Sequence, residues 1–536
     1  MDSRRRRGAA RRWRSVACAI VLVLALMPGS ALVGDSPGGA AFAIAPPRAV
    51  GTVWTWGGLD LDMWAAGAVQ PDPECPLIVP PPGKGEPFPD PRCPARILGL
   101  PDATAFAAGI DHSLVLDTTG RVWAWGDDTY GQLGIGPDSA GDCHGLPCAI
   151  TPVRLPAPTN VVALAAGNQH SLALAADGTV WAWGDDTFGE LGDGPGAPDG
   201  CAIGRLEGPC ALSPVRVAGL TDVVAIAAGN VHSLALKSDG TVWAWGDDDD
   251  GQLGDGPGGS DTCATGDMPF SCATSPIVVP GLSSIVAIAG GGTHSLAVDR
   301  AGRVWAWGFD FFGQVGDGPG GPDTCLFLTE RDPCAMSPVP VAGLGDVVAV
   351  AGGWYHSLAL DRAGRVWAWG RGDLGQLGGG QAGPDTVEVD RPGLVVGLGD
   401  AVAIAAGEVH SAALRRDGTI WTWGGTDAGQ PGDGTGAPGT CAAGSAPCVT
   451  SPVRVRGLVG VVAITSGAHG GLALVATEAA PSALPSPRVP GMPPTGGGGQ
   501  ASASEGGRVR WWLLAAVALA ASAWAATRGA CRRRAR

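Results

Sequence analysis

The sequence predicts an all-β protein that forms a closed β-propeller of seven blades. Two observations lead to this prediction. The pattern Trp-x-Trp recurs seven times in 536 residues, each time among short runs of Val, Ile, Leu and Trp that glycines interrupt. The 89 Gly and 45 Pro residues require many turns and exclude an architecture of long helices. A single core rarely grows beyond about 300 residues, so this chain is expected to be an array of repeated units.

Each repeat is expected to contain about four strands. In residues 223–246 two apolar runs flank Asp239-Gly240, a dipeptide that favours a tight hairpin turn because glycine accepts a positive φ. Side chains alternate along a strand, so Trp243 and Trp245 are expected on one face, where they fill the gap to the neighbouring sheet. A G-Q-L-G element or a variant of it, an acidic loop rich in Gly and Pro, and a further strand follow such a pair.

The two ends of the array lack complementary parts. Every Trp-x-Trp pair except the first, Trp54 and Trp56, follows a G-x-x-H element, whereas the last, degenerate copy around His469 precedes no Trp-x-Trp pair. We therefore expect residues 53–57 to complete the sheet that residues 461–475 begin. Such closure predicts a propeller domain over residues 46–476, without exposed sheet edges where the ring joins. The regular copies end at His112, His170, His232, His294, His356 and His410.

The repeated elements G-x-x-H-S-x-x-L, D-G-x-V-x-x-W-G and G-Q-L-G resemble the regulator of chromosome condensation repeat family over residues 53–475. The resemblance implies a seven-bladed propeller that lends a rigid ring to partners as different as nuclear GTPases and extracellular β-lactamases. Partner identity therefore does not follow from the fold. The sequence departs from the family pattern at Glu190, Val315 and Pro431 within G-Q-L-G, and at Gly470-Gly471, where His-Ser is expected.

Twelve cysteines fall into six pairs, each within one long loop of a repeat. The repeat with Trp367 and Trp369 lacks both members of a pair, which indicates that the two cysteines of one loop bond each other. Zinc is the competing interpretation, but no pair has the C-x-x-C spacing of strong zinc sites. Six loop disulfides imply an oxidising, extracellular setting. The predicted pairs are Cys75/Cys93, Cys143/Cys148, Cys201/Cys210, Cys263/Cys272, Cys325/Cys334 and Cys441/Cys448.

Both ends of the chain are expected to lie outside the fold. Residues 1–45 have the arginine-rich start and short apolar run of an export signal, with an uncleaved membrane anchor as the alternative. Residues 477–510 form a stalk rich in Pro, Gly, Ser and Ala. Residues 511–527 are uncharged and long enough to cross a membrane as a helix, and the basic tail at 528–536 is expected in the cytoplasm.

A short motif in the stalk suggests how the protein is retained at the cell surface. Met492, Pro493, Pro494, Thr495 and Gly496 resemble the L-P-x-T-G signal that sortases cleave and join to the cell wall, although Met492 replaces Leu. The resemblance implies an exported protein of bacterial type that is attached to the wall. Simple retention by the predicted membrane helix is the alternative.

Charge and motifs argue against several classes of activity. The net charge is −15, and both predicted terminal segments are rich in arginine, so the part between them is more acidic still and repels nucleic acid. Repeated histidines suit a structural role, a buried imidazole bonded to backbone, because a catalytic site needs one asymmetric constellation. Acidic loops such as residues 246–251 suggest Ca²⁺ ligands, but a solvated acidic rim is favoured. We expect no cofactor, no metal and no enzymatic activity.

Aromatic residues that break the repeat are the candidate binding residues: Trp64, Phe309, Phe311, Phe312, Trp354 and Tyr355. Exposed aromatic side chains anchor many protein interfaces, although burial is an open alternative here. The favoured interpretation is a non-catalytic propeller on the cell surface that binds a protein or a surface glycan. The alternatives are a secreted inhibitor of an extracellular enzyme, a guanine-nucleotide exchange factor, which requires cytosolic exposure, and an extracellular polysaccharide-cleaving enzyme.

Overall fold

The computed structural model describes residues 50–58, 69–71, 77–78, 88–90 and 92–477, the last range with short gaps. Among these residues, no helix has the length and apolar character that a membrane crossing requires. Several predictions lie outside the described residues and stay predictions: the export signal at 1–45, nearly all of the stalk with its Met492–Gly496 motif, the span at 511–527 and the basic tail. Trp64 and Cys75 lie outside them as well.

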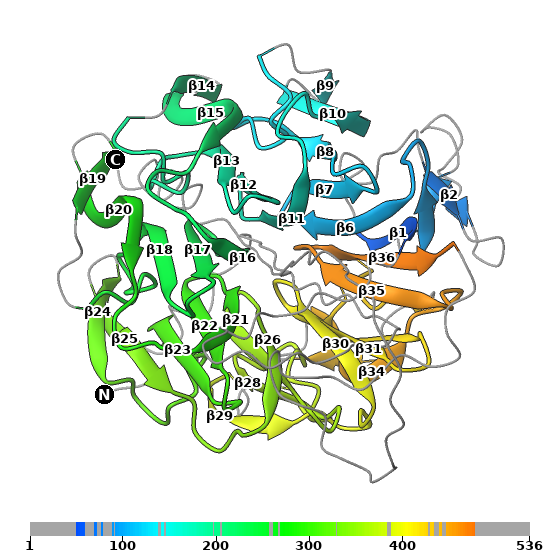
Figure 1. Ribbon diagram of the computed structural model, residues 1–536. Helices are drawn as coiled ribbons and strands as arrows, with labels where there is room; N and C mark the ends of the chain where they lie inside the picture. Colours follow the sequence, from blue (N-terminus) through cyan, green and yellow to red (C-terminus); the bar gives the residue numbers. More distant parts are fainter. Residues whose placement is uncertain are drawn as a thin grey trace, which may run out of the picture.

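The described regular structure is all β, and most of it falls into sheets that repeat one strand order (Figure 1). In each of these sheets, three short antiparallel strands lie side by side in chain order, and a fourth strand pairs with the third. One such sheet contains β11 (Val161–Ala166), β12 (His170–Ala175), β13 (Val180–Asp185), β15 (Leu206–Arg216) and β14 (Asp199–Ile203). The next contains β16 (Val223–Ala228), β17 (His232–Lys237), β18 (Val242–Asp247), β20 (Met268–Val278) and β19 (Asp261–Thr265).

Three further sheets continue the series. The first contains β21 (Ile285–Gly290), β22 (His294–Asp299), β23 (Val304–Phe309), β25 (Glu330–Pro340) and β24 (Asp323–Phe327). The second has only four strands, β26 (Val347–Gly352), β27 (His356–Asp361), β28 (Val366–Gly370) and β29 (Val389–Leu394). The third contains β30 (Ala401–Ala406), β31 (His410–Arg415), β32 (Ile420–Gly425), β34 (Ala446–Arg454) and β33 (Gly439–Cys441).

A ten-stranded sheet joins the two ends of the array. One part contains β6 (Ala103–Ala108), β7 (His112–Asp117), β8 (Val122–Asp127), β10 (Leu146–Arg154) and β9 (Asp142–Cys143). The other contains β35 (Val461–Ser466), β36 (Gly470–Ala476), β1 (Gly51–Gly57), β5 (Ala95–Ile97) and β2 (Val69–Pro71). A separate two-stranded ladder pairs β3 (Leu77–Ile78) with β4 (Phe88–Pro89).

The predicted pairing of the two ends is confirmed. All seven residues of β1 pair with β36, from Gly51 opposite Ala476 to Gly57 opposite Gly470. Figure 1 shows the sheets arranged around a centre in sequence order, with β35 and β36 beside β1 and β6. The N-terminal strand therefore supplies the third strand of a sheet whose first two strands come from the C-terminal part of the array.

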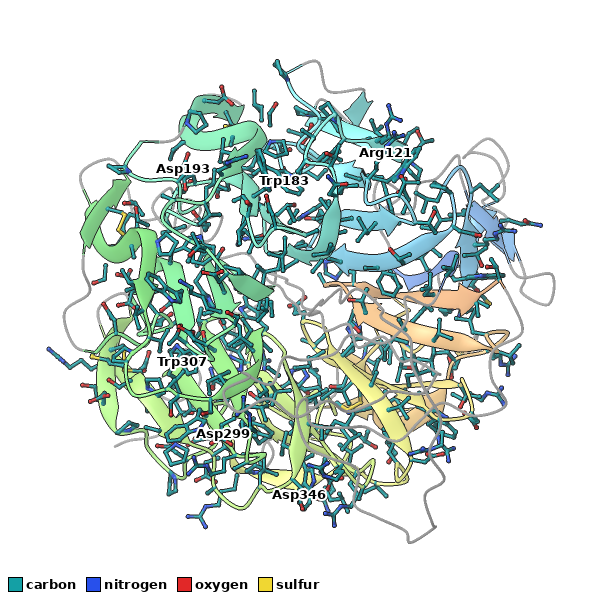
Figure 2. All side chains as sticks on the ribbon, viewed as in Figure 1. Arg121, Trp183, Asp193, Asp299, Trp307 and Asp346 are labelled. Atoms are coloured by element: carbon teal, nitrogen blue, oxygen red, sulfur yellow. A yellow bond between two sulfur atoms is a disulfide. The ribbon has the colours of Figure 1, made fainter. Side chains whose placement is uncertain are left out.

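The two tryptophans of each Trp-x-Trp pair have different surroundings. The second indole is fully buried between neighbouring sheets, as the labelled Trp183 and Trp307 illustrate (Figure 2). The first indole is only half-buried, and in several sheets a cation covers its ring, as Arg216 does for Trp181 at 5.0 Å. Both indoles of a pair therefore pack against the core, as expected, but only the second is fully enclosed.

Glycine in the G-Q-L-G element makes room for the buried indole. The last glycine of the variant G-E-L-G, Gly192, has a φ of +67° and lies directly against Trp245 of the next sheet. A Cβ atom at this position would stand 2.6 Å from the indole Cδ1, which is closer than any side chain tolerates. The glycine thus allows the backbone of one sheet to pack directly against the buried tryptophan of the next.

Candidate functional site

The repeated histidines form the seams between neighbouring sheets. His294 Nε2 lies 2.8 Å from Ser357 Oγ in the next sheet. Ser357 donates its own proton to the backbone carbonyl of Gln314, and Trp369 Nε1 donates to the same carbonyl. Because the serine proton is used in this way, His294 must donate from Nε2. The same histidine–serine bond joins His112 to Ser171, His170 to Ser233, His232 to Ser295, and His356 to Ser411.

The histidines are buried, as predicted, but the prediction that they bond to backbone was wrong. The imidazoles are buried, but their partner is a serine hydroxyl of the next sheet, which in turn bonds the backbone. Burial lowers the pKa of His294 to about 3, so its ring is neutral at physiological pH. A neutral, enclosed imidazole that already donates to serine has no access to a substrate. The histidines are therefore structural, and the serine that follows each of them was the sequence signal for their partners.

The join of the ring uses the same tryptophan bond. Trp56 Nε1 donates to the carbonyl of Gln430 at 3.0 Å. The equivalent bond to a backbone carbonyl of the preceding sheet is made by Trp183, Trp245, Trp307, Trp369 and Trp423. The hydroxyl is missing at this seam, because Gly471 stands where the other repeats have serine. Trp56 is nevertheless fully buried.

Five of the six candidate binding residues come together in one aromatic cluster, which comprises Phe309, Phe311, Phe312, Trp354 and Tyr355. Phe311 meets Phe312 edge-on at 5.0 Å between ring centroids, and Phe312 lies 4.9 Å from Tyr355. Tyr355 stacks on Trp354 at 5.0 Å, and Phe309 lies 6.2 Å from Phe311. Phe309 is the last residue of β23, and Phe311 and Phe312 lie in the loop after it. Trp354 and Tyr355 lie between β26 and β27.

The cluster has a buried base and an open top. Trp354 is enclosed against Ile110 and Ala468, which belong to G-x-x-H loops of other sheets. Phe309 is buried as well, whereas Phe312 and Tyr355 are half-buried. Phe311, by contrast, is 45% exposed. Enclosed residues therefore hold the rings in place while one ring faces solvent.

In most sheets, a pair of outer strands carries the two cysteines of one loop, and we call this pair the cysteine hairpin. The cluster lies beside the one described sheet of the array that lacks a cysteine hairpin. The loop after β23 packs on β29, where Val389 N donates to the carbonyl of Phe312 at 3.3 Å. Gly313 approaches Asp390 so closely that a Cβ atom would stand 2.6 Å from its Cα. The sheet of β29 has four strands, whereas the sheets on either side of it have five.

Charged groups surround the aromatic cluster. The guanidinium of Arg371 lies 5.4 Å from the Phe312 ring centroid, and its Nε donates to Asp373 at 2.7 Å. Asp310, next to Phe309, is buried, and its carboxylate accepts a bond from Val315 N. Burial, and beyond it the neighbouring Asp317, Glu388 and Asp390, raise the pKa of Asp310 to about 7. Sequence reasoning missed Arg371, although it directly follows W-x-W-G, where Asp127, Asp185 and Asp247 stand in other repeats, and this departure was the available signal.

The acidic residues after the Trp-x-Trp pair are buried, so the expected solvated rim was wrong for them. Asp247, Asp248 and Asp250 are almost fully enclosed. The Asp248 carboxylate accepts a bond from Leu253 N at 2.9 Å, which caps the turn of the G-Q-L-G element. Burial, with a contribution from the facing Asp255, raises the pKa of Asp248 to about 8. Within the described residues, no three or more His, Cys, Asp or Glu residues are grouped to hold a metal.

Five of the predicted cysteine pairs have their sulfur atoms joined, with Cα–Cα distances of 5.7–5.9 Å. They are Cys143–Cys148, Cys201–Cys210, Cys263–Cys272, Cys325–Cys334 and Cys441–Cys448. Cys93 is also disulfide-bonded. Because Cys75 lies outside the described residues, its pairing stays a prediction.

Solved structures share this fold. Prp20p from Saccharomyces cerevisiae aligns with a TM-score of 0.57 and 22% identity, over 82% of this chain and 94% of the yeast chain. Human WBSCR16 aligns with a TM-score of 0.58 and 22% identity, over 79% of this chain and 99% of the human chain. At this level of identity the likeness concerns the β-propeller fold alone.

Curated proteins match in sequence as well. The mitochondrial RCC1 domain-containing protein RUG3 of Arabidopsis thaliana is 30% identical over 335 residues, which are 60% of this chain and 66% of that protein. The human E3 ubiquitin-protein ligase HERC2 is 30% identical over 337 residues, 61% of this chain but only 6% of HERC2. The chain thus spans less than two thirds of the length of these relatives. A family model described as RCC1-like domain matches residues 91–473, and the chain therefore belongs to the RCC1-like domain family.

Proposed function

We propose that this protein is an exported, non-catalytic β-propeller that stands on the cell surface and binds another protein through the aromatic cluster. The observation that carries the proposal is the open ring of Phe311, held by enclosed neighbours beside the sheet without a cysteine hairpin. Binding energy in interfaces concentrates in a few aromatic and arginine side chains at rigid positions. The cluster, with Arg371 on Phe312, has that composition.

We infer that the ring has seven blades. Five sheets repeat one strand order, and the pairings within the ten-stranded sheet fall into two further groups, one around β6–β10 and one around β35, β36 and β1. The strand pairing links these two groups through a single residue pair, Gly51 opposite Ala103. That narrow link favours two separate blades over one wide sheet.

Export is supported by the cysteines and by the sequence of the ends. Five local disulfides suit an oxidising compartment, because cytosolic thiols stay reduced. The arginine-rich start, the uncharged segment 511–527 and the motif Met492–Gly496 support passage through a membrane and retention at the surface. Protease added to intact cells should therefore degrade the propeller, whereas protection until lysis would contradict surface exposure.

A binding role also suits the relatives, although their names differ. Prp20p is described through its binding to Gsp1p and histones, and a bovine relative is named a secretion-regulating guanine nucleotide exchange factor. HERC2 is named a ubiquitin ligase, but the matched part is 6% of that protein. A propeller that serves as a recognition module accommodates all three. The neutral, enclosed seam histidines give no support to catalysis in this chain.

The test uses the full-length protein and two variants at exposed apolar residues. Chemical cross-linking on intact cells is compared for the wild type, Phe311→Ala and Ile150→Ala. Ile150 is 46% exposed on β10, so it matches Phe311 in exposure but lies outside the cluster. We expect Phe311→Ala to abolish a specific cross-linked species that Ile150→Ala retains. Equal cross-linking in both variants would show that the aromatic cluster is not the binding surface.

A further inference from the structure

Among the described strands, β29 has no outer strand paired to it, whereas the fourth strand of each neighbouring sheet pairs with a fifth. In the preceding sheet, β24 pairs with β25 along Asp323–Phe327 and stands beyond the core strands. The following sheet has the corresponding pair β33 and β34. Between them, β29 pairs with β28 only, among the described strands. In the described part of the chain, β29 is thus a sheet edge, and the loop that carries the aromatic cluster packs beside its start.

The surface where this loop meets β29 is acidic. Asp317, Glu388 and Asp390 stand close enough to Asp310 to act on its carboxyl group electrostatically. Glu388 is exposed, and Asp317 and Asp390 are half-buried. Arg391 contributes one positive charge beside Gly318. The carboxyl groups therefore outnumber this arginine along the side of the loop that faces β29.

The cluster already holds a guanidinium. Arg371 covers Phe312 at 5.4 Å, and its charge is balanced by two bonds to Asp373 at 2.7 and 2.9 Å. This intramolecular contact shows that the rings and the surrounding carboxylates accept an arginine. Phe311 meets Phe312 edge-on and is stacked with the buried Phe309 at 6.2 Å, with much of its surface left to solvent. A second cation has an equivalent ring to cover.

We propose that the partner presents an extended basic segment that lies beside β29, with an arginine or lysine over Phe311 and further cations facing Glu388 and Asp390. The proposal rests on the proposed function, since it names the chemistry of the partner for that same surface. Opposite charges would speed the encounter and select the partner, while the aromatic contact would slow dissociation. An acidic or neutral segment gains neither effect.

The experiment measures binding of two short labelled peptides to the full-length protein by fluorescence anisotropy. One peptide alternates arginine with leucine, and the other replaces every arginine by glutamate. We expect the basic peptide to bind at least about tenfold more tightly, and added salt to weaken it. Glu388→Gln should weaken the basic peptide about three- to fivefold, as for other exposed charge pairs. Asp102→Asn, an equal loss of charge at an exposed site before β6, should change nothing.

The variant Phe311→Ala separates the two proposals. If both peptides bind equally and both are lost in Phe311→Ala, the cluster binds but the basic partner is wrong. If Phe311→Ala binds the basic peptide as tightly as the wild type, the proposed function fails together with this inference. Binding of neither peptide would overturn the basic segment as the ligand. Weaker binding of the basic peptide in both Phe311→Ala and Glu388→Gln, with the acidic peptide unaffected, supports the proposal.

Discussion

Replacing Trp56 by alanine tests the closure of the ring. Trp56 is fully buried, its Nε1 donates to the carbonyl of Gln430, and Gly432 and Gly471 lie directly against its ring. Truncating a buried tryptophan to alanine costs about 3–5 kcal/mol, because apolar contacts are lost and a cavity remains. Trp245 provides a matched control in the middle of the array, since it is equally buried and donates to the carbonyl of Glu190 at 2.7 Å.

Both alanine variants should lose a similar free energy of unfolding, measured by urea denaturation of the oxidised protein. Hydrogen exchange should then distinguish them. Trp56→Ala should speed exchange in β1 and β36, whose ladder depends on this indole, whereas Trp245→Ala should leave that ladder protected. A loss below about 1 kcal/mol for Trp56→Ala, with several kcal/mol lost for Trp245→Ala, would refute the idea that β1 is a structural member of the ring.

Two further predictions concern the seam beside Glu190 and the hairpin disulfides. In an earlier repeat, Gln132 stands at the position of Glu190 and donates its amide to Asp127, which corresponds to Asp185. Because Glu190 has a carboxyl in place of this amide, Glu190 and Asp185 must instead share a proton. Burial first, and then Asp185, raises the pKa of Glu190 well above its usual value, so this carboxyl stabilises the fold at low pH and the stabilisation is lost as the pH rises. Glu190→Gln should therefore raise the Tm at pH 8 more than at pH 5, and an equal shift at both values would contradict the shared proton. Replacing Cys325 and Cys334 together by serine should cost about 2 kcal/mol in urea unfolding and speed proteolysis of the loop, whereas an unchanged protein would show that the bond adds nothing.

The backbone plan was accessible to sequence reasoning because it depends on counting. The unmatched Trp54 and Trp56 at one end and the unmatched His469 at the other predicted the join between β1 and β36. Cysteine pairing was equally accessible, because both cysteines of a pair lie in one loop. In each case the partners are identified along the chain itself.

Features that arise between sheets were less accessible. Phe312 and Tyr355 belong to loops of different sheets, and no spacing along the chain indicates that they meet. The same reason explains why His294 was expected to bond backbone, whereas its partner is Ser357 in the next sheet. The burial of Asp248 depends likewise on how the next sheet covers its turn.

The strand that closes the ring imposes an order on its formation. Trp56 and the carbonyl that accepts its hydrogen bond are 374 residues apart, so the ribosome makes β1 long before Gln430 and β36. Until β36 is made, the edge of β1 that pairs with it exposes unpaired backbone groups. Each hairpin disulfide joins cysteines only 5 to 9 residues apart and can form during this interval. A chain truncated before β36 would keep its hairpin disulfides but could not close the ring. Its unpaired strand edges would favour aggregation.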